Sequence, residues 1–517
     1  MARIAVIGAG MGAMAAAARL AVAGHRVAVY ERGSTHGGGV GRLTRDGFAF
    51  DTGPGLLHLP AVYRDLFVKT GKEPLERCVE LRQVDPAVAH VFADGTRVAL
   101  PNASRAGVVD ALDGAFGAGA GERWSDLVNR AREVWDATRR PLLEEPLPAD
   151  RSALGGDPYP ALRRGWFQRG PAPLARVARR ELADPRLAAL LESRALAYGL
   201  DPRQVPASAS VLAYLEQTFG SWYARGGTRA LADALHARCL ARRVEFFFGA
   251  EASAVLTRDG RAAGVVLADG TTVEADAVVA GVSPGRLARL LPPEVAAAAP
   301  AGADGAVDGE GGALGRFSVL LALRGARPAE TAHRTVVHPA DRDAEYAQLF
   351  PGRAGRRRTS VPAVGGVAAR PTVTVLRPDD PELVPDAEHE AITVTAAARP
   401  HGAVDWTDPA LAEQAAERLV TVAQAAVPGL RDRLLWRETR TPHDTARDTG
   451  VATGGVPAPA LAGADGRFLA APNPGPLPGL YRVGGWSHPG GGLAHAGMSG
   501  AMVAGLIVDG ADWRGSQ

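Results

Sequence analysis

The stretch "RIAVIGAGMGAMAAAARLAVAGHRVAVYE", residues 3–31, joins two short apolar runs through a glycine-rich turn and an alanine-rich segment. Its pattern predicts a buried strand over 4–7, a helix over 11–23 and a second strand over 26–31. This order of elements is typical of the first βαβ unit of a doubly wound α/β fold, in which the turn after the first strand holds the phosphates of a dinucleotide.

Small residues occupy the turn at the spacing that such a site requires. Gly8, Gly10 and Ala13 fill the G-x-G-x-x-G/A pattern, and Gly12 is an additional glycine. Glycines permit close approach of a pyrophosphate to the helix N-terminus. Glu31, at the end of the second strand, suits the hydroxyl groups of a ribose without a 2′-phosphate. This residue does not distinguish FAD from NAD, and a purely structural glycine turn is the alternative interpretation.

A second glycine cluster follows directly in "HGGGVGRLTRDGFAFDTGP", residues 36–54. An NAD-binding domain would normally continue into its next helix at this point, whereas a second loop on the phosphate side suits the longer FAD molecule. Gly38, Gly39, Gly53 and Pro54 are the candidate contacts in this segment. A surface loop without a ligand is the alternative.

The composition places the chain among ordinary globular proteins. It has 517 residues, of which 46% are hydrophobic and 22% charged, enough for two or three domains. The net charge of +2 gives no reason to expect nucleic acid as a partner. Cys78 and Cys239 are the only cysteines and have no metal-ligand spacing, so we expect a reducing cytosol and no metal site. No apolar run reaches the ~18 residues of a spanning helix.

Four blocks carry a family resemblance: "GFAFDTGPGLLHLPAVYRDLF" (47–67), "YLEQTFGSWYARGGTRALADAL" (214–235), "ADAVVAGVSP" (275–284) and "GLYRVGGWSHPGGG" (479–492). The chain resembles the bacterial phytoene desaturase family. These proteins are FAD-dependent carotenoid desaturases within the amine-oxidase-like superfamily. The blocks occur in the family's order and extend over nearly the whole chain, and they indicate the family more specifically than the substrate.

The resemblance implies an α/β (α+β) two-domain flavoprotein. Its Rossmann-like FAD-binding domain would be discontinuous, built from 1–89, 225–295 and 471–517. An interleaved substrate domain of mixed sheet and helices would take 90–224 and 296–470.

Local patterns fit the central piece of this arrangement. Residues 226–240 have the pattern of a helix, and two strand patterns follow at 252–260 and 262–281. Asp-Gly pairs at 259–260 and 269–270 predict tight turns.

The resemblance also implies further FAD contacts. Ala252 stands where the family usually has a valine whose backbone contacts adenine, and a main-chain contact tolerates that change. The C-terminal glycines would approach the ribityl chain and open the last helix, whose N-terminal N–H groups favour negative charge on the flavin. The residues concerned are Gly484, Gly485, Gly491, Gly492 and Leu493.

The sequence departs from the family after the ribose-binding acid, where Gly-Gly-Arg is usual. The counterpart of that arginine is Gly39, and Arg42 follows three residues later. Either Arg42 or Arg32 would then supply the positive charge near the phosphates.

The implied reaction is dehydrogenation of a carbon chain. Flavin N5 would take a hydride from an allylic carbon, a proton would leave the neighbouring carbon, and oxygen or a quinone would reoxidise the flavin. His488 and His495 are the candidate proton acceptors, with structural hydrogen bonding as the alternative role. Trp222 and Tyr223 would line the cavity, and Asp51 would hold its loop.

A basic segment over 158–186 suggests contact with an anionic membrane. Together with Asp157 it contains seven arginines and three acids, a net charge of +4, beside Trp166 and Phe167. A solvated helical face is the alternative. We therefore expect a cytoplasmic protein that takes a lipophilic isoprenoid, with contact to the inner face of the cell membrane.

Two other functions keep the same motifs. An FAD-dependent oxidase or dehydrogenase of secondary metabolism would oxidise a C–C or C–N bond in a smaller intermediate. A non-catalytic protein would bind flavin or lipid only as a carrier or structural partner.

Overall fold

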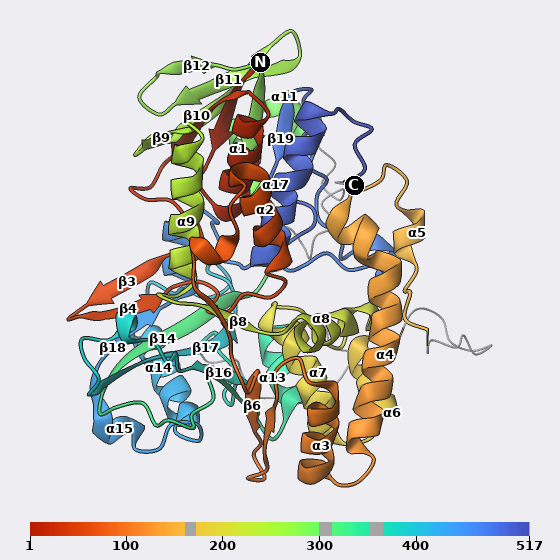
Figure 1. Cartoon of the computed structure of the whole chain (residues 1–517), viewed down its shortest axis with the longest axis vertical. Helices are drawn as coiled ribbons and strands as arrows, with labels where there is room; N and C mark the ends of the chain where they lie inside the picture. Colours follow the sequence, from red (N-terminus) through yellow and green to blue (C-terminus); the bar gives the residue numbers. More distant parts are fainter. Residues whose placement is uncertain (161–171, 299–312, 352–364, 516–517) are drawn as a thin grey trace.

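The computed structural model describes residues 1–160, 172–298, 313–351 and 365–515. In Figure 1, strands β10, β11 and β19 and helices α1, α9 and α17 lie in the upper part of the molecule. Helices α3, α6, α7 and α8 and the sheet around β14 and β17 lie in the lower part.

A parallel sheet of five strands forms the upper part, and segments far apart in the chain supply its strands. Apolar residues of successive strands are paired, as in Val29, Val6 and Val279. Strands buried on both faces carry such continuous apolar runs. In spatial order the strands are β19 (Leu480–Arg482), β13 (Ala277–Ala280), β1 (Arg3–Ile7), β2 (Arg26–Glu31) and β9 (Glu245–Phe248).

Helices α1 (Met11–Val22) and α17 (Leu493–Val508) pack closely against each other beside this sheet. The alanines at 15–18 are fully buried. A Cβ at Gly500 would lie 2.7 Å from the Cβ of Ala15, so only glycine fits there. Small residues in both helices therefore hold the two ends of the chain together.

The lower part contains a mixed sheet of seven strands. Its order is β18 (Leu434–Arg440), β14 (Gly315–Arg324), β17 (His389–Ala398), β16 (Val373–Leu376), β15 (Arg334–Val337), β6 (Val88–Val91) and β7 (Arg97–Leu100). Only the β15–β6 pair is parallel; the other neighbouring pairs are antiparallel.

Smaller sheets complete the described strands. They are β10 (Ala252–Arg258), β11 (Arg261–Leu267) and β12 (Thr272–Glu274), then β3 (Arg42–Arg45) with β4 (Phe48–Asp51), and β5 (Leu81–Gln83) with β8 (Trp222–Ala224).

The remaining α-helices in the described ranges are α2 (Ala61–Gly71), α3 (Arg105–Phe116), α4 (Ala120–Arg139), α5 (Ser152–Gly155), α6 (Leu174–Leu182), α7 (Pro185–Ala197), α8 (Val211–Phe219), α9 (Thr228–Ala241), α10 (Pro284–Leu290), α11 (Pro293–Ala298), α13 (Arg342–Leu349), α14 (Pro409–Ala423), α15 (Leu430–Arg433) and α16 (Pro442–Thr449). Short 3₁₀ turns cover Leu75–Arg77, Ala207–Ser210, Pro381–Leu383 and Ala464–Gly466, and a π-turn covers Arg140–Glu144.

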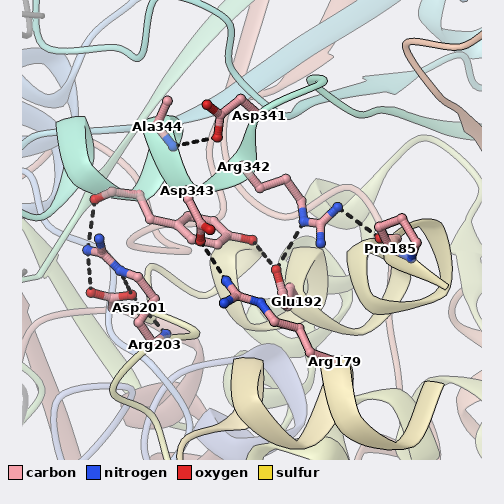
Figure 2. A network of polar contacts seen from close by, with 10 residues as sticks. Arg179, Pro185, Glu192, Asp201, Arg203, Asp341, Arg342, Asp343 and Ala344 are labelled. Carbon is pink, nitrogen blue, oxygen red and sulfur yellow. Dashed lines mark hydrogen bonds and ion pairs between the residues drawn. The ribbon is translucent and has the colours of Figure 1, made fainter. Parts of the chain in front are cut away.

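A buried carboxylate fixes helix α7 to helix α13, as Figure 2 shows. Glu192 of α7 is 1% exposed and accepts hydrogen bonds from Arg342 Nε at 3.0 Å and from the Tyr346 hydroxyl at 2.9 Å. On the outside, Arg179 of α6 pairs with Asp343 at 2.7 Å. These contacts hold α6, α7 and α13 in one layer.

The α/β fold class and the mixed sheet are confirmed. The first βαβ unit agrees with the prediction to within one residue at each end. The tight turns predicted at 259–260 and 269–270 are confirmed, since each joins two antiparallel strands. The pattern over 262–281 comprises three strands, β11, β12 and β13. The predicted domain boundary after residue 89 falls inside β6, a strand of the lower sheet. The division into two domains otherwise stays a prediction.

Candidate cofactor and substrate cavity

The N-terminal turn leaves an open space in front of helix α1. Gly8 has a φ of +89° and donates its N–H to the Tyr30 carbonyl at 2.8 Å, which joins the ends of β1 and β2. A Cβ on Gly10 would meet nothing within 4 Å. No side chain caps the N-terminus of α1. Its first N–H groups are therefore available to an anion.

Glu31 connects this turn to the next loop. One carboxylate oxygen accepts the N–H of Ala9 at 2.7 Å, and the other accepts that of Gly33 at 2.7 Å. Each oxygen keeps a lone pair for a hydroxyl group. Glu31 lines the cavity, so the predicted ribose contact is compatible with its position.

The second glycine cluster lies over the first. Gly37 donates its N–H to the Ala9 carbonyl at 2.8 Å, and a Cβ on Gly38 would lie 3.0 Å from the Gly10 Cα. A Cβ on Gly53 would lie 2.1 Å from the Gly39 carbonyl oxygen. The loop around Gly53 can therefore approach the loop around Gly39 only because residue 53 has no side chain.

Asp51 holds this loop, as the sequence analysis predicted. Its carboxylate accepts the N–H of Thr228 at 2.6 Å and that of Arg229 at 3.2 Å. Burial raises its pKa, while these hydrogen bonds oppose the shift. The carboxylate is therefore engaged with the N-terminus of α9.

Arg42 and Arg32 both line the cavity, and each is held by a backbone carbonyl. Arg42 Nη2 donates to Gly226, and Arg32 Nη2 donates to Arg447. Which of the two contacts the phosphates stays a prediction. The sequence analysis missed Arg286, whose Nη2 donates to the Ala252 carbonyl at 2.9 Å. Its position just after strand β13, at the carboxyl edge of a parallel sheet, was the available signal.

The C-terminal glycines meet the N-terminal ones. A Cβ on Gly12 would lie 2.7 Å from the Gly484 Cα. Gly484 has a φ of +99° and donates its N–H to Ser499 Oγ at 3.0 Å. Helix α17 begins at Leu493 without a side-chain cap, and Gly492 lines the cavity in front of it. The molecule thus brings two uncapped helix N-termini to one cavity.

A cavity of about 1130 Å³ extends from these turns to the lower part of the molecule. Pockets for single drug-sized ligands have roughly 300–1,000 Å³, so this cavity is larger than the usual range for one such ligand. The predicted contacts that line it are Gly8, Gly10, Gly12, Ala13, Glu31, Arg32, Gly38, Gly39, Arg42, Gly53, Pro54, Ala252, Gly484, Gly485, Gly492 and Leu493.

Two predicted cavity contacts, Gly491 and Trp222, lie outside this lining. Gly491 is outside the lining, because it packs on the Pro457 carbonyl, 1.9 Å from the site of a Cβ. Trp222 is also outside, while Tyr223 lines the cavity. Within the basic segment, residues 161–171 lie outside the described part of the chain, so the aromatic half of the predicted membrane contact is not placed.

The two candidate histidines differ in position. His495, in the first turn of α17, lines the cavity, and burial lowers its pKa to about 4. His488 is fully buried outside the lining, with Nε2 2.9 Å from the Glu145 carbonyl oxygen. Its pKa is also lowered by burial to about 4. His488 therefore lies away from the cavity in which a flavin would bind, which argues against its predicted role as proton acceptor, whereas His495 lines that cavity. Proton transfer by His495 stays a prediction.

The match to the flavin-containing amine oxidoreductase family covers residues 14–305, and the chain belongs to this family. It is an FAD-dependent oxidoreductase.

Two similar proteins have names from carotenoid metabolism. A hydroxyneurosporene desaturase of Rubrivivax gelatinosus is 28% identical over 98% of this chain and 93% of its own length. A 4,4'-diapolycopene oxygenase of Methylomonas sp is 29% identical over 54% of this chain, a match that spans about half of that protein.

Solved structures show the same fold. An oxidoreductase from Methanosarcina mazei has a TM-score of 0.63 at 18% identity, covering 97% of this chain and 99% of that one. Putrescine oxidase has a TM-score of 0.64 at 13% identity, covering 98% and 99%.

The residues of the cavity fit FAD. Open space at Gly10 and Gly39 leaves room that a side chain would fill. The uncapped N-termini of α1 and α17 supply N–H groups for negative charge at two separate places. A long cofactor with a pyrophosphate and a flavin ring matches this pair of positions.

Proposed function

We propose that this chain desaturates a long, phytoene-like isoprenoid and that FAD accepts the hydride. One observation carries the proposal: a single cavity joins the dinucleotide turn to an interior space between the helical layer and the mixed sheet. The similarity to a hydroxyneurosporene desaturase over nearly the full length of both chains supports the substrate class.

Apolar side chains from several elements line the lower part of the cavity. They are Leu196, Leu212, Leu215, Val336, Leu376 and Leu383. An unactivated hydrocarbon gains most of its binding energy from such surfaces, at roughly 25 cal/mol per Å² of apolar area removed from water. A small polar metabolite would not need a cavity of this extent.

FAD supplies the hydride acceptor, a task that no amino-acid side chain performs. The chain's own residues bind, orient and exclude water. The uncapped N-terminus of α17 favours negative charge on a group in front of it. Burial lowers the pKa of His495 to about 4, so its ring is neutral at pH 7 and keeps a nitrogen lone pair for a proton, although the same burial makes it a weaker base than an exposed histidine.

Oxygen or a quinone would complete the cycle by reoxidising the flavin. Among the described residues, no helix is both long and apolar enough to span a membrane. We infer that the protein draws its substrate from a membrane surface. Exposed Arg176, Arg179 and Arg180 on α6 support this. However, Arg179 pairs with Asp343 and the apolar face of α6 packs inside the protein, so the contact would be electrostatic.

The substrate class can be tested in a host that produces phytoene. Expression of the wild-type chain is expected to give a coloured polyene with more conjugated double bonds than phytoene. A Gly10→Val variant, whose side chain would enter the cofactor space, serves as the inactive control. A colourless extract despite yellow, soluble wild-type protein would contradict the substrate class and favour a smaller metabolite.

A further inference from the structure

Three charged side chains in the lower part of the cavity form one cluster. Arg194 of α7 donates to Glu216 of α8 at 2.5 Å, and Arg334 of β15 donates to the other oxygen of the same carboxylate. Their side chains are only 13%, 11% and 11% exposed, in that order, and all three line the cavity.

This cluster carries excess positive charge. Although burial opposes it, Arg194 and Arg334 lower the pKa of Glu216 to about 2, so the carboxylate is ionised. Burial lowers the pKa of Arg194 to about 10, still well above neutrality. Arg316 also lines the cavity and donates to the Ala197 carbonyl at 3.2 Å. One carboxylate therefore faces two guanidinium groups, an arrangement that is costly unless another anion joins it.

A second cluster of the same composition shows how this chain satisfies such a group when its role is structural. Glu390 accepts from Arg377 at 2.7 and 2.9 Å and from Arg433 at 2.8 Å. Both arginines also donate to backbone carbonyls, Arg377 to Ala426 and Arg433 to Arg324. None of the three residues lines the cavity. In this cluster the guanidinium groups donate to acceptors of the protein itself.

The cavity cluster leaves donor capacity unused. Arg334 Nε is buried and has no hydrogen-bond partner among the described residues. Buried polar groups are nearly always paired, and an unpaired donor is costly. Arg194 and Arg334 both line the cavity, so an acidic group on a substrate there would add an acceptor to this cluster.

We propose that Arg194 and Arg334 bind a carboxylate at one end of the isoprenoid chain. This inference rests on the proposed function and narrows its substrate to an oxygenated, acid-terminated isoprenoid. Guanidinium groups match carboxylate geometry and make strong, charge-assisted hydrogen bonds. The anion would offset the excess positive charge, while the apolar lining binds the hydrocarbon part.

Helix α7 is built to hold Arg194 in place. Glu192, two residues earlier, anchors the helix to α13 through Arg342 and Tyr346 (Figure 2). Little reorganisation is then needed when the acid binds, which favours affinity.

The test uses the purified FAD-loaded protein and three isoprenoids of one chain length that end in a methyl group, an alcohol or a carboxylic acid. Dissociation constants come from the change in the flavin spectrum at neutral pH. The acid is expected to bind at least about tenfold more tightly than the other two. Arg334→Met and Arg194→Met should each remove most of that preference. Arg433→Met, in the structural cluster, is the matched control and should keep it.

The outcomes separate this inference from the proposed function. The carboxylate site would be overturned if the acid binds no more tightly than the alcohol and the methyl-terminated compound, even if all three reduce the flavin. It would also be overturned if Arg433→Met loses as much of the preference for the acid as Arg334→Met does. Tight, Arg334-dependent binding of the acid without flavin reduction by any compound would keep the site and overturn the desaturase function. Flavin content is checked for each variant. If Arg334→Met does not fold, Arg334→Lys takes its place, because it keeps the charge but not the Nε donor. It should lose part of the preference for the acid.

Discussion

Gly10 and Gly114 are both glycines around which a Cβ would meet nothing within 4 Å, but they face different spaces. Gly10 faces the cofactor cavity, and Gly114 lies on the exposed side of α3. Gly10→Val should therefore fold but lose FAD, with at least about a hundredfold weaker binding, since the methyl groups occupy the cofactor's space. The flavin-to-protein ratio after purification measures this. Gly114→Val should retain its flavin, and a yellow Gly10→Val protein would refute the placement.

His495 is the residue whose chemistry is most open to test. If its neutral ring accepts the substrate proton, His495→Gln should lower kcat by about 10²- to 10⁴-fold while flavin content stays unchanged. Steady-state kinetics with matched flavin loading provides the measurement. An unaltered kcat would assign His495 to packing at the start of α17.

Burial of His495 also makes the stability of the folded protein depend on pH. Because the folded-state pKa of His495 is about 4 and its unfolded value is 6.5, the unfolded chain binds more protons between these values. Stability is present above pH 6.5 and is lost as the pH falls toward 4. Between pH 7 and pH 5 this histidine should account for about 2 kcal/mol of lost unfolding free energy. Urea unfolding of His495→Gln at both pH values should show a smaller loss than the wild type.

At the scale of elements, α13 forms a buried ion pair with α7 and an exposed ion pair with α6. Arg342→Met leaves Glu192 charged and buried, so unfolding free energy should fall by about 3 kcal/mol. Arg179→Met removes a pair whose partners are 56% and 62% exposed, and should cost less than about 1 kcal/mol. Urea midpoints of the two variants compare them directly. Equal losses would mean that the Glu192 contact does not anchor α7.

Elements with a local signal were predictable, and those that depend on distant pairing were not. The glycine turn between β1 and α1 is encoded within a dozen residues, so its position follows from spacing. The β6 strand pairs in parallel with β15, about 240 residues away, through contacts such as His90 with Val336. The alternation of apolar and polar residues in each strand does not specify which other strand it pairs with. For this reason the domain boundary predicted after residue 89 falls inside β6.

At the scale of the whole molecule, the candidate cofactor contacts were largely predictable because glycine spacing reflects close backbone approach. The orientation of His488 toward the Glu145 carbonyl was not, since it depends on a residue 343 positions away. The two Arg–Glu–Arg clusters show the same limit. Their residue types are identical, and only the folded chain distinguishes a satisfied cluster from one that opens to a cavity.

Both ends of the chain are proposed to enclose one FAD, which would oxidise an isoprenoid in the adjoining cavity. The most direct measurement mixes the purified protein with phytoene or its acid-terminated analogue without oxygen and follows the flavin absorbance. The yellow flavin is expected to bleach, with one new conjugated double bond formed per flavin reduced. A flavin that stays oxidised in the presence of bound isoprenoid, or a folded protein that refuses FAD, would contradict it.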